Sequence, residues 1–545
     1  MRPCYVVLGL AAAARGGALT KSTLRVRTWW RLLREYGSMK RVYAAHAAQD
    51  FFVYGTPPAR YEDLGSHVAF AQLEALRARK NDGGAFASTV TFAGDFPVLP
   101  TYLPIEEGAA ACLGILGLAA ADLHELRGGS PQEVTVRQSD AGLSTAGYMF
   151  LDVEPDGNYG GCKGFEGTID QEGKVNPVRK AYEAGDGSHV FLHGGFPKLK
   201  RGILDFLDAE PTVESIGAAV KRWKGADLEA AMQAKQLAVT LCRTPAEWRA
   251  SPQGRVVAGL EPVTFSRAEG DHAGHVRRLK PGVRPLSDVI VVDFSHVIAS
   301  PMVGRTLADF GATVFKVVTK KRPRRALFDE ETNNGKQPLE LDLADAADLA
   351  RLWSLLDAAD VLVDGYTEGA LAKFGLDEAA VFARCPHLVF LRVSCYGHDG
   401  PLSAAKGFQQ NANFATGVGT IADEDLLGYQ LTSQTDYATG FLGAFGVVRA
   451  LTERQLAAER GELAPMRVRA SLCQAATWMA QFGARLPTFR DYAKRITRLL
   501  FKLDGRMRVD GNLKYLPLAL TMSETPPARV TGFARWWTDD VVPKL

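Results

Sequence analysis

The sequence holds 545 residues, of which 46% are hydrophobic and 23% are charged, with a formal net charge of +3. This length is enough for two to four domains whose cores need no crosslinks. The near-neutral charge gives no reason to expect a nucleic-acid partner, which would require a face rich in basic residues. The 7 cysteines are scattered without a CxxC pair or a cysteine–histidine cluster. The sequence therefore predicts neither a disulfide framework nor a metal site.

Residues 1–66 are expected to form an N-terminal extension. Residues 1–34 contain no Asp or Glu but several Arg, a composition typical of a mitochondrial transit segment. The alternative is a poorly ordered extension ahead of a start at Met39. A mitochondrial or cytoplasmic location follows from these two interpretations. No apolar run reaches the roughly 18 residues that a membrane span needs.

The first half of the chain carries a pattern that the second half repeats. A long helix rich in Ala, Leu and Gly is expected over 106–127, followed by a turn and a strand over 133–136. Residues 441–451 (FLGAFGVVRAL) place small residues where residues 112–122 (CLGILGLAAAD) place them, and a strand at 467–472 follows. We interpret this as an internal duplication, with chance similarity between two alanine-rich helices as the alternative.

A compact α+β unit is expected between the two copies. Strands are expected at 189–192 and 237–241, and helices at 216–223 and 226–234. The run Thr244-Pro245-Ala246-Glu247 has the residues of a capping box, with Thr at the N-cap, Pro at the first helical position and Glu at the third. This run predicts the start of a further helix.

Residues 284–417 alternate strands and helices, which predicts an α/β fold with a parallel sheet and crossover helices. The apolar run 288–294 (DVIVVDF) is typical of a strand buried on both faces. Ser300 and Pro301 suit the N-cap and the first position of a helix over 302–310, whose free N–H groups would favour an anion. Further strands are expected at 313–318, 338–343, 360–363 and 387–393.

Two polar turns follow strands of this expected sheet. The basic loop 320–325 (KKRPRR) comes at the carboxyl end of a parallel strand, where α/β proteins bind ligands, and this favours contact with phosphate groups. A solvated loop and a nuclear-localisation patch are the alternatives. His398 and Asp399 lie in a Gly-Pro turn, and we expect them to be turn residues rather than a catalytic pair.

Several phrases of the second half carry a resemblance through their common order and spacing. They are PLSDVIVVDFSHVIASPMVGRTLADFGATVFKV, NNGK, ADVLVDGYTEGALAKFGL, CPHLVFLRVSCYGHDGP, KGFQQNANFATG, TDYATGFLGAFGVVRAL and MRVRASLCQAA. Over about 284–480 the chain resembles the family III CoA-transferases, the group of formyl-CoA transferase and α-methylacyl-CoA racemase. Residues 106–262 resemble the latter part of a second copy, including the family's small domain. The chain is therefore identified as a duplicated and rearranged member.

In this chain the small domain precedes the CoA-binding half. The family that the chain resembles usually has these two domains in the reverse order. The expected units are an N-terminal extension (1–66), a partial first copy of the helical and strand region (67–186), a small α+β domain (187–265), a linker (266–283), a Rossmann-like CoA-binding domain (284–435), and a long helix with the second copy and a C-terminal tail (436–545).

The resemblance also implies an acyl-CoA substrate bound across the carboxyl ends of the strands, with no metal. Three of the implied CoA-binding positions lie in the first turn of the sheet, and a fourth lies in the basic loop. One more matches an aromatic residue of the family, and the last two match basic residues of the family. They are His296, Val297, Ala299, Lys320, Tyr366, Lys336 and Lys373.

The expected catalytic position holds an unexpected residue. The family nucleophile is an aspartate that closes a Gly-Phe/Tyr-Asp phrase, and its attack on the thioester gives a mixed anhydride and then an aspartyl-CoA thioester. Only a carboxylate can form that anhydride, but this chain has Gln409 there. The histidine of the racemase branch is replaced by Phe408, whereas its later aspartate is matched by Asp436. Asp436 is thus a candidate catalytic residue, with a simple helix N-cap as the alternative.

Three functions remain open at this point. The first is an acyl-CoA-dependent transferase that moves CoA between an acyl-CoA and a carboxylic acid, with Asp436 or a partner chain's group replacing the missing nucleophile. The second is a non-catalytic CoA-binding or scaffold protein, and the third is an acyl-CoA racemase or isomerase. Because relatives of this fold form interlocked dimers, we expect a homodimer or an internal pseudo-dimer of the two partial copies.

Overall fold

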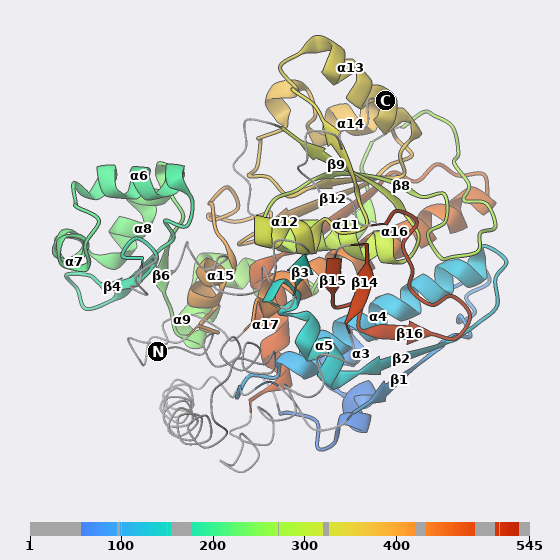
Figure 1. Cartoon of the computed structure of the whole chain (residues 1–545), viewed down its shortest axis with the longest axis horizontal. Coiled ribbons are helices and arrows are strands. Elements are labelled where there is room, and N and C mark those ends of the chain that lie inside the picture. The colour runs from blue at the N-terminus through green and yellow to red at the C-terminus, as the bar shows by residue number, and fades with distance from the viewer. Residues whose placement is uncertain are drawn as a thin grey trace.

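The computed structural model (Figure 1) describes residues 56–94, 99, 101–149, 151–153, 176–270, 272–319, 326–419, 432–484, 507–511 and 513–532. Most of the expected N-terminal extension lies outside these ranges, and so does the basic loop with Lys320.

A seven-stranded sheet forms the centre of the chain's second half, in the order β10-β9-β8-β11-β12-β13-β7. Six of its strands are parallel, and β7 pairs antiparallel with β13 at one edge. The predicted α/β fold is therefore confirmed, although the sequence did not indicate β7. The strands are β7 (Thr264–Arg267), β8 (Ile290–Phe294), β9 (Thr313–Val318), β10 (Gln337–Glu340), β11 (Val361–Asp364), β12 (Val389–Ser394) and β13 (Met466–Ser471).

Both faces of this sheet are covered by helices, which explains why its strands are apolar runs without alternation. Val361 and Val363 of β11 face one apolar cluster, whereas Leu362 between them faces the other. The first cluster is completed by α11 (Ala299–Asp309) and α16 (Gln434–Glu459), and the second by α13 (Ala346–Ala358) and α14 (Glu378–Arg384). Figure 1 shows α13 and α14 above the sheet and α11 and α16 below it.

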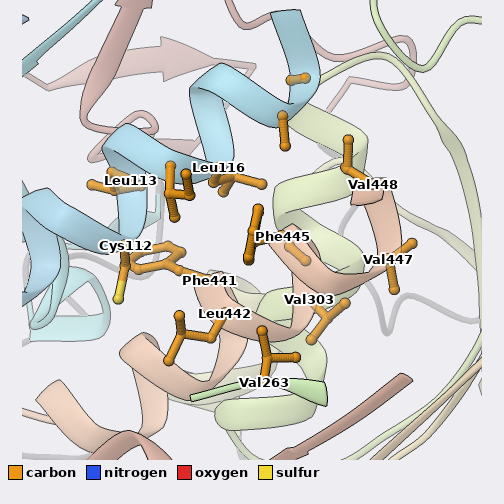
Figure 2. Close-up of a cluster of buried hydrophobic side chains, with 14 of the residues drawn as sticks. Cys112, Leu113, Leu116, Val263, Val303, Phe441, Leu442, Phe445, Val447 and Val448 are labelled. Atoms are coloured by element: carbon orange, nitrogen blue, oxygen red, sulfur yellow. The ribbon is translucent and has the colours of Figure 1, made fainter. Parts of the chain in front are cut away.

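The two long helices predicted at the matching positions of the duplication pack against each other. The helix α4 (Ile105–Leu126) lies beside α16 with Leu113 and Leu116 towards Phe441 and Phe445 (Figure 2). It is the one described helix long and apolar enough to cross a membrane, but 89% of its most apolar window is buried in the protein, as in a core helix. The core of the molecule therefore joins the two segments that the sequence analysis interpreted as copies.

The expected first copy contributes β1 and β2 to a smaller sheet of three strands, in which they pair parallel and β16 from the C-terminal region pairs antiparallel with β2. As β13 leads into α17 (Leu472–Met479), so β2 leads into α5 (Gln138–Ser144). The remaining elements of this region are η2 (Tyr61–Ser66), α3 (Val68–Glu74), β1 (Thr89–Ala93), β2 (Glu133–Arg137), η3 (Gly147–Met149), β3 (Asp152–Val153), η6 (Ala480–Phe482), β14 (Arg508–Asp510), β15 (Leu513–Tyr515) and β16 (Leu520–Met522).

The expected α+β unit has a three-stranded antiparallel sheet, β4-β5-β6, with its own apolar core. The capping box is confirmed: Thr244 accepts a hydrogen bond from the Glu247 amide, and Glu247 accepts one from the Thr244 amide. The elements are β4 (Ala181–Glu183), β5 (His189–Leu192), α6 (Pro197–Leu207), α7 (Val213–Val220), α8 (Gly225–Ala234), β6 (Val239–Cys242), α9 (Pro245–Ala250) and α10 (Pro252–Ala258).

One predicted helix start was wrong. The helix α11 begins at Ala299 with Ile298 at its N-cap, so Ser300 lies inside the first turn and does not cap it. Its predicted end is confirmed, because Gly311 follows the helix with a φ of 102°, a conformation that glycine adopts freely. The other short elements near this sheet are α12 (Ala326–Thr332), η5 (Ala372–Phe374) and α15 (Gln409–Thr416).

A glycine sets how closely α16 approaches the start of α11. A Cβ atom on Gly440 would lie 2.5 Å from the Met302 Cβ and 2.9 Å from the Ala299 carbonyl oxygen. We therefore expect Gly440→Ala to lower the free energy of unfolding by about 1–3 kcal/mol, as overpacking does, measured by urea denaturation.

The matched control is Gly217→Ala in α7, where a Cβ atom would be 3.7 Å from the Tyr182 ring, an ordinary contact. This variant should be as stable as the wild type or up to about 1 kcal/mol more stable, because alanine favours helix. If Gly440→Ala behaves like Gly217→Ala, the close approach does not constrain the fold.

Candidate functional site

The strand order of the central sheet reverses between β8 and β11, and ligands of open α/β sheets bind at the carboxyl ends of strands at such a point. The turn after β8 contains the predicted residues His296, Val297 and Ala299, all partly exposed. The turn after β11 lies beside it, because the Gly365 amide donates to the Phe294 carbonyl over 2.8 Å. Tyr366 follows in that second turn. The structure therefore brings these four predicted CoA contacts to one edge of the sheet.

Val297 has a strained backbone. Its φ is 73°, in the left-handed region that β-branched residues rarely adopt. The Val297 carbonyl accepts a hydrogen bond of 3.2 Å from the Thr332 hydroxyl of α12, which helps to hold this conformation. Strain of this kind concentrates at ligand-binding and catalytic sites, where the surrounding structure maintains it. The turn predicted to contact coenzyme A thus contains a strained backbone position that a hydrogen bond from α12 supports.

Lys336 does not lie where the sequence placed it. Its side chain is completely buried, and its ammonium group bonds the Asp293 carboxylate at 2.7 Å, the Pro301 carbonyl at 2.7 Å and Asn333 at 3.1 Å. An ammonium group held in this way cannot also contact a phosphate. The prediction that Lys336 binds coenzyme A directly is therefore wrong in this structure, because the lysine instead supports the turn from below.

Two lysines share the Asp293 carboxylate, since Lys316 lies 3.5 Å from its second oxygen. Burial alone would raise the pKa of Asp293, but the two ammonium groups bring it below its ordinary value. Burial lowers the pKa of Lys336 to about 7. Lys316 also donates to the backbone and side-chain oxygens of Ser295. One signal could have revealed this cluster: an aspartate inside the apolar strand DVIVVDF needs a buried cation.

Lys373 is exposed in η5, with its ammonium group 4.8 Å from the centre of the Phe374 ring. Its contact with coenzyme A stays a prediction, and Lys320 lies outside the described residues. Among those residues, no group of three or more His, Cys, Asp or Glu side chains is arranged to hold a metal ion.

Gln409 is 3% exposed and both ends of its amide are engaged at the start of α16. Its oxygen accepts a hydrogen bond of 3.0 Å from the Asp436 amide, and its nitrogen donates to the Thr432 carbonyl over 3.2 Å. The residue at the N-cap of α16, Ser433, makes no side-chain cap, so Gln409 supplies one from another helix. An aspartate or glutamate could accept from the Asp436 amide but could not donate to Thr432.

Asp436 lies beside Gln409 on the first turn of α16, so the two predicted catalytic positions are neighbours. The Asp436 side chain is partly exposed, and among the described residues no hydrogen bond to its carboxylate is present. Burial raises the pKa of this carboxyl to about 7, against the opposing charge of Arg179. A carboxyl that titrates near neutral pH is a candidate for acid, base or nucleophile.

The small domain covers this region through an aromatic cluster. The Phe408 ring stacks on His193 at 4.2 Å and on Phe196 at 5.1 Å, and Phe196 lies 5.5 Å from His296 of the first turn. The sequence did not indicate these contacts, since they join segments that are far apart in the chain. Phe408 is therefore an apolar wall where the racemase branch has its histidine.

A hydrogen-bonded chain holds the Phe408–Gln409 turn from behind. Asn411 accepts from the Phe408 amide at 3.0 Å and donates to Thr240 of β6 at 2.9 Å, and Thr240 in turn bonds the Tyr396 hydroxyl at 2.5 Å. His398 is partly exposed, and its ring bonds the Ala470 carbonyl at 3.1 Å. It ties two strand ends together.

Comparison with known proteins gives relatives for the part of the chain that contains this site. Residues 286–491 match the model of CoA-transferase family III. An acyl-CoA transferase of Gibberella moniliformis is 28% identical over 413 residues, which are 68% of this chain and 70% of that protein. An acetyl-coenzyme A transferase of Hypoxylon pulicicidum is 27% identical over 52% of this chain and 51% of its own length.

Among solved structures, a hypothetical protein of Mycobacterium tuberculosis is 27% identical, covers 35% of this chain and 56% of its own, and gives a TM-score of 0.32. The chain thus spans about 70% of the Gibberella relative and about half of the Hypoxylon relative. Residues 286–491, which match this family model, contain the turns after β8 and β11 together with Gln409 and Asp436, and the ordered phrases of the sequence carried a resemblance to the same family.

Proposed function

We propose that the chain binds an acyl-CoA at the carboxyl edge of the central sheet, with the turn after β8 as its first contact. The strand order, with its reversal between β8 and β11, is that of Rossmann-like nucleotide-binding sheets and supports this placement. The strained Val297 and Tyr366 lie in the turns after β8 and β11, and Lys373 is exposed in η5, which follows β11 in the chain. Relatives named as acyl-CoA and acetyl-coenzyme A transferases support an acyl-CoA substrate.

We further propose that the protein transfers CoA from an acyl-CoA to a carboxylic acid, with Asp436 as the reacting carboxylate. The observation that carries this proposal is the position of Asp436: it adjoins Gln409, is partly exposed, and has a pKa raised by burial to about 7. A carboxylate is required because the first intermediate must be an anhydride. The amide of Gln409 cannot supply it.

The transfer of CoA can proceed with the Asp436 carboxylate as the only group of the protein that forms covalent bonds. Its carboxylate attacks the thioester carbonyl, the C–S bond breaks, and CoA leaves as a thiolate beside a mixed anhydride. The thiolate attacks the aspartyl carbonyl, releases the acyl group as a carboxylate, and leaves an aspartyl-CoA thioester. The acceptor carboxylate attacks this thioester and frees the thiolate again. The thiolate then attacks the acceptor carbonyl, which yields the new acyl-CoA and restores Asp436.

Binding without chemistry is the second candidate, and the Gln409 hydrogen bonds favour it. An amide that caps α16 and is 3% exposed acts as a structural residue at the position where the family has its nucleophile. A racemase is less well supported, since it needs acid and base groups on both sides of the α-carbon and Phe408 is an apolar wall on one of them.

Coenzyme A should stabilise the folded protein. A ligand that binds only the folded state adds about 2.7 kcal/mol at a hundredfold excess over its Kd, so 1 mM CoA should raise the Tm by several degrees in a thermal-shift assay. Lys373→Ala should reduce the rise of the Tm on addition of CoA and the salt dependence of that rise. Lys221 is a cation on the small domain, and Lys221→Ala should change neither. No shift of the wild type at millimolar CoA or acetyl-CoA would contradict both candidate functions.

If Asp436 reacts as a carboxylate, CoA exchange between succinyl-CoA and a small carboxylic acid should rise as the pH passes about 7 and then level off. Asp436→Asn should lower turnover on the order of 10³-fold or more, measured by following acyl-CoA exchange, because the covalent group is lost. A variant that keeps wild-type turnover would exclude Asp436 from the reaction.

The same carboxyl affects stability with a definite sign. The pKa of this carboxyl in the folded protein lies above its ordinary value of 3.8, so the folded state holds the proton more tightly than the unfolded state. This contribution is present below pH 4 and is lost as the pH rises through about 7. Asp436→Asn should therefore gain stability relative to the wild type at pH 8 and not at pH 4.

Gln409 separates the two candidate functions. Gln409→Glu removes the donor to Thr432 and should cost about 1–3 kcal/mol in urea denaturation, whereas Gln410→Glu next to it should stay within about 0.5 kcal/mol. Under the binding-only function, wild type shows no CoA exchange and Gln409→Asp gains it. Exchange by the wild type that Gln409→Asp does not increase supports Asp436 as the reacting group.

A further inference from the structure

The residues that lead into α16 are held by a segment from the first half of the chain. This segment, residues 145–148, directly follows α5. The Thr145 carbonyl accepts a hydrogen bond of 3.0 Å from the Ser433 amide, and the Thr145 hydroxyl shares a hydrogen bond of 2.9 Å with the Thr432 hydroxyl. All three residues are buried, so these bonds lie inside the protein. Thr145 therefore restrains both residues that precede the first turn of α16.

Tyr148 of the same segment adds two contacts. Its hydroxyl accepts a hydrogen bond of 3.3 Å from the Ser433 hydroxyl, and its backbone amide donates to the Tyr437 hydroxyl over 3.3 Å. The Tyr148 ring is itself fixed, because it packs edge-on against the Phe328 ring of α12 at 5.2 Å. Ser433 and Tyr437 lie on either side of Asp436 in the sequence. The contacts of Tyr148 therefore bracket the position of Asp436.

Gln409 joins these contacts to Asp436. Its side-chain nitrogen donates to the Thr432 carbonyl over 3.2 Å, and its oxygen accepts from the Asp436 amide over 3.0 Å. The Gln409 amide can bridge the two groups only while Thr432 keeps its place, and the Thr145 hydroxyl bonds Thr432 there. A continuous path of hydrogen bonds thus leads from Thr145 through Thr432 and Gln409 to the backbone of Asp436.

We infer that Thr145 and Tyr148 are positioning residues for the CoA transfer: they hold the first turn of α16 so that the Asp436 carboxylate keeps one place relative to the bound thioester. The inference rests on the proposed function, in which Asp436 is the reacting group. Thr145 is 0% exposed and Tyr148 is 6% exposed, so both act through the turn and not on the substrate. A displacement of a reacting group by about 1 Å can lower a rate on the order of 100-fold, so bonds that restrain its backbone affect turnover.

The test is Thr145→Val, because valine has nearly the shape of threonine and lacks the hydroxyl that bonds Thr432 and the Gly142 carbonyl. The kcat of CoA exchange between succinyl-CoA and a small carboxylic acid should fall about 10- to 100-fold. The KM for succinyl-CoA should stay near that of the wild type, since the turns after β8 and β11 are unchanged. Thr145→Ser keeps the hydroxyl and should restore the kcat.

The pH profile gives a readout that a loss of stability alone would not change. Burial raises the pKa of Asp436 to about 7, and a loosened turn exposes this carboxyl to water. The midpoint of the kcat profile of Thr145→Val should therefore move below that of the wild type, towards the ordinary range of a carboxyl.

The matched control is Thr452→Val, in the same helix but far from Asp436. The Thr452 hydroxyl donates to the Val448 carbonyl over 2.9 Å, and the residue is 1% exposed. This variant should lower the Tm and leave the kcat and the pH midpoint unchanged. A second variant, Tyr148→Phe, removes the acceptor of the Ser433 hydroxyl and should lower the kcat about 2- to 10-fold. The rise of the Tm with CoA checks that each variant is folded and binds CoA.

The outcomes separate this inference from the proposed function. Wild-type kcat and pH midpoint in Thr145→Val, or an equal loss of kcat in Thr452→Val, overturns the inference while the proposed function stands. If Thr145→Val does not fold, wild-type kcat in Tyr148→Phe overturns the inference in the same way. No exchange by the wild type, or wild-type turnover in Asp436→Asn, overturns the proposed function and the inference with it.

Discussion

The start of α16 depends on two hydrogen bonds that come from outside the helix. Ser433 does not cap it, and Gln409 satisfies the exposed Asp436 amide while its nitrogen holds the Thr432 carbonyl. Because α16 packs against α4, α11 and the sheet, the position of its first turn affects every layer of the second half. The amide side chain of Gln409 thus fixes the start of the helix that carries Asp436. The same amide stands at the position where the family has its reactive carboxylate.

The edge of the sheet proposed to bind coenzyme A is supported by buried charge as well as by apolar packing. The ion pair of Asp293 and Lys336 bonds the end of β8 to the first turn of α11. Because Gly440 has no Cβ atom, α16 can pack closely against that turn. Removing one partner of a buried ion pair costs about 3–5 kcal/mol, since the other charge is left without compensation. The turn after β8 is therefore supported by the buried ammonium group of Lys336 and by the close packing of α16.

The sequence was sufficient for the features set by local pattern. The run DVIVVDF predicted a strand covered on both faces, and the residues Thr244 to Glu247 predicted a capping box that the structure contains. Lys336 could not be placed in this way, because a lysine is ordinarily exposed and its partner Asp293 is 43 positions away. The stack of Phe408 on His193 and the hydrogen bond between Thr145 and Thr432 likewise depend on how distant segments meet. Local pattern therefore predicted the elements and their order, but not the neighbours of the site residues.

The left-handed backbone of Val297 has a consequence for how this protein trades stability against recognition. A β-branched residue in that conformation costs on the order of 1–3 kcal/mol, which a glycine would avoid. Glycine would also allow the turn many more conformations in the absence of ligand, and each would have to be lost on binding. Val297 thus moves an entropic cost from the binding step to the folding step. A chain optimised for stability alone would not keep valine at this position.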